Sequence, residues 1–112
     1  VYVSEYRNNR IQVFDTQGRF LRKWGARGSG DGEFNQPQGL AIDGIGNVYV
    51  SEYGNDRLQL FDRNGKFLRR WGNDGIGDEQ IGWSHSLAID GDGNVYVSDH
   101  WNDRISAFKP TV

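Results

Sequence analysis

The two histidines, His85 and His100, are the residues of this sequence that could most readily carry metal chemistry. A neutral imidazole is a common zinc ligand, but a zinc site needs three or four protein ligands. The chain has no cysteine, so thiolate ligands are excluded. His85 is a candidate zinc ligand only if copies from a threefold assembly meet, and the alternative is a lone histidine without metal. We expect His100 to be exposed.

Other catalytic arrangements are not found. No Ser-His-Asp, Cys-His or phosphate-loop pattern is present. Asp90, Asp92 and Asn94 place oxygens at alternate positions, as calcium loops do, but the terminal Glu of such loops is missing. A hairpin turn explains these residues, so we expect no resident cofactor, with a divalent metal such as zinc at His85 as the alternative.

Composition narrows the classes of partner. The 112 residues carry a net charge of −2 with a pI near 5.6, which disfavours nucleic acid as a partner. Arg22-Lys23-Trp24 and Arg69-Arg70-Trp71 combine basic and aromatic residues, but we expect them to be solvated on an outer strand. No apolar run approaches the roughly 18 residues of a membrane span, so no membrane partner is expected. Composition identifies no cellular compartment.

An internal repeat is the main organising feature of the sequence. Residues 1–6 (VYVSEY) return at 48–53 (VYVSEY) and at 95–100 (VYVSDH), with a spacing of 47 residues each time. The pairs Trp24-Gly25 and Trp71-Gly72 keep the same spacing. Substitutions between copies are conservative, which favours drift after duplication over a designed array of identical units.

Each period predicts four short strands. In the middle copy these are 39–43, 48–52, 57–61 and 66–71, each rich in β-branched or aromatic residues and bounded by Gly or Asn. Asn64-Gly65 is a strong hairpin signal because such turns require positive φ. Four antiparallel strands per repeat, with apolar residues at both parities, indicate an all-β propeller blade buried on both faces.

The motifs of the repeat resemble a known family. Residues 34–43 (FNQPQGLAID), 46–51 (GNVYVS), 55–61 (NDRLQLF) and 65–67 (GKF) are similar to the NHL repeat, and the resemblance covers essentially the whole chain. It implies a six-bladed β-propeller. The stretch 85–88 (HSLA) also resembles a zinc-binding histidine site of the peptidyl-hydroxyglycine lyase branch of propellers, although the matching residue in the previous copy is Gln38.

The strand count predicts an incomplete propeller in a single domain. We expect a partial blade over 1–25, a full blade over 39–72 and a partial blade over 86–110, about two and a half blades in all. The chain begins at Val1 inside an apolar run, as a processed product or a piece of a longer protein would. Bare terminal blades favour association, so we expect a homo-oligomer of two or three chains.

One loop face differs between copies. The loop before the first strand and the loop between strands two and three should share this face. Gln36, Pro37 and Gln38 become Trp83, Ser84 and His85, while Tyr53 and Gly54 become His100 and Trp101. Loops on a rigid scaffold often carry binding sites. The hypothesis is a binding surface, with loop drift as the alternative, and its candidate residues are Gln36, Gln38, Tyr53, Trp83, Ser84, His85, His100 and Trp101.

Several charged and amide residues instead repeat strictly in phase. We expect them to form a structural network of hydrogen bonds and ion pairs between blades. They are Glu5, Asn8, Arg10, Glu52, Asn55, Arg57, Asp99, Asn102 and Arg104.

These observations predict a non-enzymatic propeller scaffold that self-assembles and binds a partner, in the first place another protein, through one loop face. Two alternatives remain open. One is a metal-dependent lyase-like or hydrolase-like propeller with His85 near the central channel. The other is an assembly unit or propeller fragment without a ligand.

Overall fold

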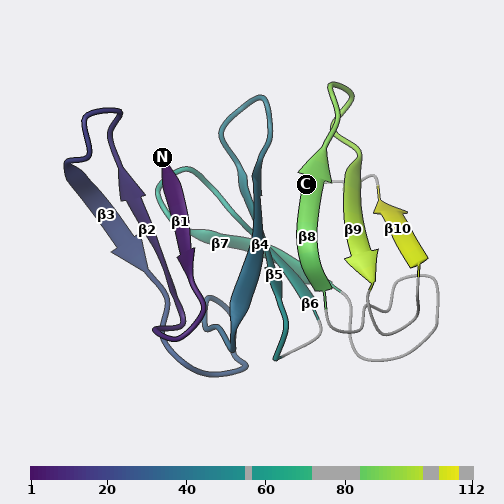
Figure 1. Ribbon diagram of the computed structural model, residues 1–112, viewed down its shortest axis with the longest axis horizontal. Coiled ribbons are helices and arrows are strands. Elements are labelled where there is room, and N and C mark those ends of the chain that lie inside the picture. Colours follow the sequence, from purple (N-terminus) through teal and green to yellow (C-terminus); the bar gives the residue numbers. More distant parts are fainter. Residues whose placement is uncertain (55–56, 72–83, 100–103, 109–112) are drawn as a thin grey trace.

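The structure is a computed structural model that describes residues 1–54, 57–71, 84–99 and 104–108, with the backbone alone at 71, 84–85, 99, 104, 106 and 108. The described residues form ten strands in three antiparallel sheets that lie side by side (Figure 1). The predicted all-β fold of partial propeller blades is thus confirmed. No helix in the described ranges has the length and hydrophobicity that a membrane crossing requires.

Each sheet is one repeat of the sequence. The first sheet contains β1 (Tyr2–Glu5), β2 (Arg10–Phe14) and β3 (Phe20–Trp24). The second contains β4 (Pro37–Ile42), β5 (Val48–Glu52), β6 (Arg57–Phe61) and β7 (Phe67–Trp71). The third contains β8 (Ser84–Ile89), β9 (Val95–Asp99) and β10 (Arg104–Phe108). Strands follow one another in chain order within each sheet, as in a meander.

The turns explain where strands begin and end. In the β6–β7 turn, one Asp62 oxygen accepts hydrogen bonds from the backbone N–H groups of Asn64 and Lys66, and Gly65 has φ of 90°. An aspartate that accepts from its own turn and a glycine at positive φ define a tight reversal. β7 therefore begins at Phe67, one residue later than predicted, because Lys66 belongs to the turn.

The corresponding turn at Asp90 has the same construction. Its carboxylate oxygens accept from the backbone N–H groups of Asp92 and Asn94 and from the side chains of Asn94 and Tyr96. These bonds hold the oxygens of Asp90 within the hairpin, which supports the hairpin interpretation of this segment over a calcium loop.

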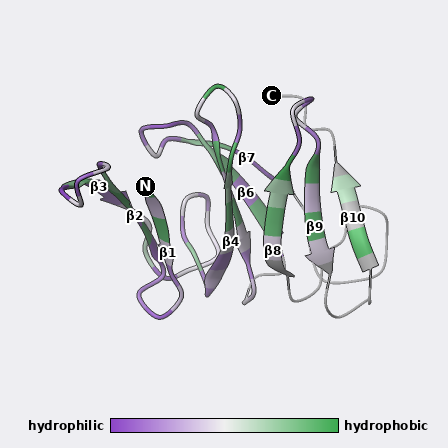
Figure 2. Ribbon diagram, turned by 45° about the horizontal axis from the view of Figure 1, so that its top comes forward, coloured by the Kyte–Doolittle hydropathy of each residue, from purple (hydrophilic) through white to green (hydrophobic). Residues whose placement is uncertain are grey.

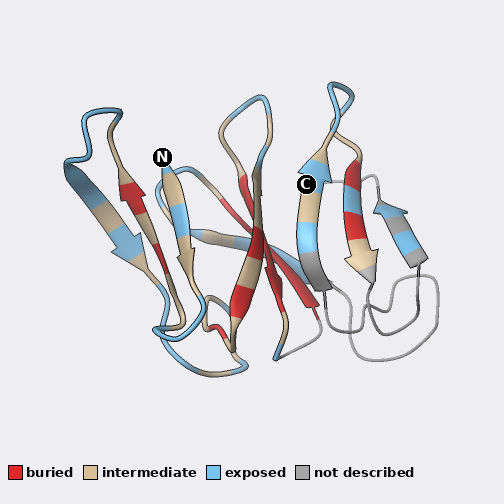
Figure 3. Ribbon diagram, in the orientation of Figure 1, coloured by how far each residue is buried: buried red, intermediate tan, exposed pale blue. Residues whose placement is uncertain are grey.

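The second sheet is buried on both faces, as predicted. Every residue of β5 and β6 is buried (Figure 3). Val48, Val50 and Phe61 pack toward the first sheet in a cluster with Ile11 and Phe34. Alternate residues point the other way, where Tyr49, Leu58 and Leu60 pack against Val95 and Val97 of the third sheet. Hydrophobic bands alternate with paler ones along β8 and β9 in Figure 2.

The first strands of neighbouring sheets approach closely. β4 contacts β8 and also β1. At Gly39 in β4, an added Cβ would lie 3.2 Å from the backbone nitrogen of Leu87 in β8 and closer still to Ser51 Oγ, which accepts a 2.9 Å bond from Gly39 N–H. β4 begins at Pro37, two residues before the predicted Gly39, because a register shift lets Pro37 pair with Glu52.

Gly39→Ala should therefore destabilise the chain, by about 1–3 kcal/mol as is typical of overpacked sites. The matched control is Gly44→Ala, because an added Cβ at Gly44 meets no atom within 4 Å and should leave stability unchanged or slightly raised. Urea unfolding midpoints measure the difference. Equal midpoints for the two variants would contradict the close packing of Ser51 and Leu87 around Gly39.

Candidate functional site

A buried ion pair lies at the end of the second sheet from which the variable loops emerge. Glu52 in β5 and Arg57 in β6 are direct partners across the strand pair. Arg57 Nε lies 2.6 Å from Glu52 Oε2, and the side chains are 7% and 0% exposed, respectively. Arg57 also donates to three backbone carbonyls of the loop between β3 and β4: Ser29 O (2.6 Å), Gly30 O (3.0 Å) and Glu33 O (2.8 Å).

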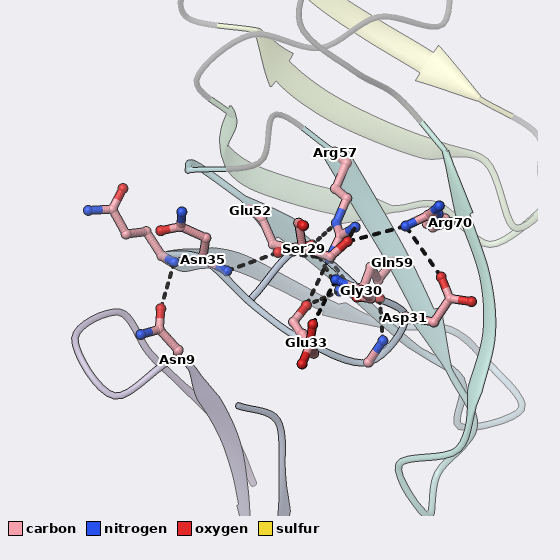
Figure 4. A network of polar contacts seen from close by, with 12 residues as sticks. Asn9, Ser29, Gly30, Asp31, Glu33, Asn35, Glu52, Arg57, Gln59 and Arg70 are labelled. Atoms are coloured by element: carbon pink, nitrogen blue, oxygen red, sulfur yellow. Dashed lines mark hydrogen bonds and ion pairs between the residues drawn. The ribbon is translucent and has the colours of Figure 1, made fainter. Parts of the chain in front are cut away.

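Gln59 completes this network (Figure 4). Its Nε2 donates to Glu52 Oε2 (2.9 Å) and to Glu33 O (2.7 Å), and its Oε1 accepts from Gly32 N–H (2.9 Å). Glu52 Oε1 accepts from Asn35 N–H at 3.1 Å. Backbone groups of the loop are thus paired with the side chains of three residues of β5 and β6. The network holds the connecting loop against the second sheet.

The first sheet carries the same pair in a more exposed setting. Arg10 Nε lies 2.6 Å from Glu5 Oε2, with side-chain exposures of 33% and 19%. Hydrogen bonds from Arg10, Asn8 and Gln12 lower the pKa of Glu5 from 4.5 to about 2. Because this pKa lies below the unfolded value, the pair stabilises the fold above about pH 4.5, and the contribution is lost as the pH falls toward 2.

Both ion pairs join two strands of one sheet, where the sequence predicted a network between blades. Among these predicted residues and their neighbours, Arg57 and Gln59 reach the loop that connects the first sheet to the second. In the third sheet, Asp99 and Arg104 are paired in backbone register. Their side chains, and all of Asn55 and Asn102, lie outside the described residues.

Two loops of the predicted face meet at Gln36 and Tyr53. Tyr53 N–H donates to Gln36 O (2.9 Å), and Gly54 N–H donates to Asn35 O (3.0 Å). An added Cβ at Gly54 would clash with the Asn35 side chain, so the glycine makes room for this contact. The loop before β4 and the loop after β5 thus lie side by side, as the meander predicts.

Two non-glycine residues with positive φ also meet on this face. Asn9 has φ of 53° and Gln36 has φ of 57°, and Asn9 Oδ1 accepts a 2.9 Å hydrogen bond from Gln36 N–H. Such conformations are uncommon for residues other than glycine and cluster at functional sites. The bond joins the β1–β2 turn of the first sheet to the loop that leads into the second.

A hollow of about 320 Å³ opens at this junction. Its described lining comes from the β1–β2 turn and from both ends of the β3–β4 loop. The lining residues are Tyr6, Arg7, Asn9, Arg27, Asn35 and Gln36. The lining combines two guanidinium groups, three amides and one phenol. It can therefore offer several hydrogen-bond donors and positive charge to a ligand.

The structure describes part of the predicted binding surface. Gln36 lines the hollow, and Tyr53 is bonded to it through the backbone. Gln38 lies within β4, where its carbonyl accepts from Ser4 Oγ (3.1 Å), and it does not line the hollow. Trp83, His100 and Trp101 lie outside the described residues. Ser84 and His85 are described by their backbone alone, at the start of β8.

The hollow contains residues that the sequence prediction missed. Comparing the second and third copies singled out Gly54 and Trp101. Extending the same comparison to the first copy would have added Arg7, which occupies the equivalent position. The contribution of Asn9 depends on its positive φ, and the only sequence signal for it is that asparagine adopts this conformation more readily than most residues.

A second hollow, of about 550 Å³, lies on the opposite face between the β4–β5 and β8–β9 turns. Its lining includes Asp43, Asp90 and Asp92, but the first two carboxylates accept hydrogen bonds from their own turns. Within the described residues, no three His, Cys, Asp or Glu side chains form a group that could hold a metal ion.

The sheets and their packing define the chain as a segment of a β-propeller. Residues 1–58 match the model of the DUF5128 family, which is described as a 6-bladed beta-propeller. The match covers more than half of the 112 residues, and the chain belongs to this family. No curated protein matches the sequence.

Arg57→Leu should lower the free energy of unfolding by about 3–5 kcal/mol, because it leaves the Glu52 carboxylate buried without its charged partner. The matched control is Arg10→Leu in the first sheet, where solvent screens the partly exposed pair and the loss should be clearly smaller. Urea unfolding of both variants measures the two losses. A loss for Arg10→Leu as large as that for Arg57→Leu would contradict the special role of the buried pair.

Proposed function

We propose that the chain is a non-enzymatic β-propeller scaffold of the NHL-repeat kind, which self-assembles through its outer sheets and binds a protein partner through the loop face. The NHL assignment is supported by the motifs at 34–43, 46–51 and 55–61. The self-assembly rests on one observation, which is that repeat positions buried inside the molecule are exposed on the first and third sheets.

The third sheet exposes residues whose equivalents are buried. Ile11 and Leu58 are 0% exposed, whereas Ile105 at the same repeat position is 69% exposed. Tyr49 is 3% exposed and its equivalent Tyr96 is 39% exposed. In the second sheet these positions are covered by the next blade. The outer face of the third sheet therefore has the composition of a blade-to-blade interface.

The first sheet exposes the complementary set. Val48 and Val50 are 0% exposed, while their equivalents Val1 and Val3 are 65% and 39% exposed. Within one chain, Val95 and Val97 of the third sheet pack against Tyr49, Leu58 and Leu60 of the second sheet. Val1 and Val3 of one copy would pack in the same way on Tyr96 and Ile105 of another copy. The resulting contact is head-to-tail, and such contacts can close into a ring.

Two copies supply the number of sheets that the family description requires. The described residues of each chain form three sheets, so a closed pair would bring six of them together, and the family is described as 6-bladed. A pair of chains therefore fits the described family better than a trimer does.

The loop face is the part of this scaffold proposed to bind another protein. Loops from two successive blades converge there around the hollow, and its shape is set by hydrogen bonds between the loops. Recognition by loops on a rigid β-scaffold is a common arrangement.

The mass of the 112-residue chain in solution tests the self-assembly. We expect twice the chain mass of 12.7 kDa by sedimentation equilibrium. Ile105→Asp should shift the equilibrium to monomer, because a charge would be buried at the contact. Ile45→Asp is the matched control, since Ile45 is 71% exposed on a turn away from both outer faces.

A folded wild-type monomer would contradict self-assembly, as would equal effects of the two aspartate substitutions. A trimer would contradict closure by two copies.

A further inference from the structure

We infer that the hollow between the β1–β2 turn and the loop before β4 binds a carboxylate group presented by a protein segment. This inference rests on the proposed binding of a protein through the loop face and adds the chemistry of the recognised group. The juxtaposition of Arg7 and Arg27 in one hollow carries it.

Both arginines are available for a ligand. Arg7 and Arg27 are exposed, and none of the ion pairs found among the described residues includes either one. None of the six described lining residues is acidic. Guanidinium groups bind carboxylates through paired, charge-assisted hydrogen bonds. The amides of Asn35 and Gln36 can add neutral donors at the same place.

The backbone that carries each arginine is held in place before any ligand binds. Arg27 pairs with the buried Phe34 in an isolated bridge, with Phe34 N–H donating to Ala26 O (2.7 Å) and Gly28 N–H donating to Phe34 O (2.9 Å). Arg7 lies in the β1–β2 turn, which Asn9 N–H closes by donating to Glu5 O (2.9 Å). A preformed site loses less conformational entropy on binding.

The two arginines also break the repeat, whereas the structural network keeps it. Arg7 corresponds to Gly54 and Trp101 in the other copies, and Arg27 corresponds to Asp74. By contrast, the Glu5–Arg10 pair recurs as Glu52–Arg57 with the same 2.6 Å contact. A residue that stabilises each blade is expected in every copy of the repeat, whereas a residue of a single ligand site is expected in one copy only. The positive charge is therefore specific to this junction.

The size and charge of the site favour one carboxylate over a polyanion. A hollow of about 320 Å³ lies at the small end of ligand pockets, which span roughly 300–1,000 Å³. The chain as a whole carries a net charge of −2, so no long-range attraction draws an extended anion such as RNA. A single glutamate, aspartate or C-terminal carboxylate within an otherwise neutral segment fits both facts.

The inference is tested by NMR titration of the ¹⁵N-labelled chain with short peptides. The probe is N-acetylated and amidated Gly-Ser-Glu-Ser-Gly, and the control peptide has Gln in place of Glu. A third peptide, N-acetylated Gly-Ser-Gly-Ser-Gly with a free C-terminus, separates a terminal carboxylate from a side-chain carboxylate. A separate titration with inorganic phosphate tests whether the hollow prefers phosphate to a carboxylate. The protein variants are Arg7→Gln and Arg27→Gln.

Arg19→Gln is the matched control, since Arg19 lies at the opposite end of the first sheet with its side chain 75% exposed. We expect saturable shifts at residues 6–9, 26–28 and 35–36 with a carboxylate peptide and none with the Gln peptide. Each hollow variant should weaken binding about tenfold, as expected for one lost hydrogen bond to a charged group. Arg19→Gln should bind like the wild type.

Shifts with both carboxylate peptides no larger than those with the Gln peptide, or unchanged affinity in both hollow variants, would overturn the inference. Tighter binding of phosphate than of either carboxylate peptide would overturn the choice of carboxylate. Spectra of the variants show directly whether each remains folded. The solution mass is an independent readout, so loss of the carboxylate site would leave the proposed self-assembly standing.

Discussion

The ion pair between Glu52 and Arg57 is the interaction on which the arrangement of the loop face depends. Two opposite charges are buried at the end of a sheet, where an unpaired charge would be strongly unfavourable. The guanidinium satisfies its remaining donors on carbonyls of the β3–β4 loop, and the carboxylate accepts from Asn35 N–H. The loop is therefore held in place by the hydrogen-bonding needs of a buried pair, together with the burial of Phe34.

The first two sheets carry the same Glu–Arg pair, and they differ in how far the β3–β4 loop covers it. The distance between the charged atoms is 2.6 Å in both sheets, because cross-strand register sets it. The exposure differs, since the connecting loop covers Arg57 and leaves Arg10 partly open. The pair is thus a repeated element of the blade, and the loop over it is the variable element. The same loop carries Arg27 and Gln36 into the hollow.

Much of the fold follows from the sequence, because period and turn chemistry are local signals. Strands 48–52 and 57–61 were predicted at the residues where the structure has them, and the contact of the loops at Gln36 and Tyr53 follows from the meander. The site was only partly predictable. Gln36 adopts a positive φ that its residue type does not favour. Arg57 reaches carbonyls more than twenty residues away, which no local pattern encodes. The register shift at Pro37 is likewise a tertiary effect.

Amide hydrogen exchange at Gly32 and Asn35 shows whether the buried ion pair and its neighbours hold the β3–β4 loop. These two N–H groups donate to the side chains of Gln59 and Glu52, respectively, so their exchange reports whether the buried network holds the loop. We expect both amides to exchange much more slowly than amides of an unstructured peptide. Exchange at the unstructured rate, while the amides of β5 and β6 stay protected, would contradict the claim that the Glu52–Arg57 pair positions the loop face.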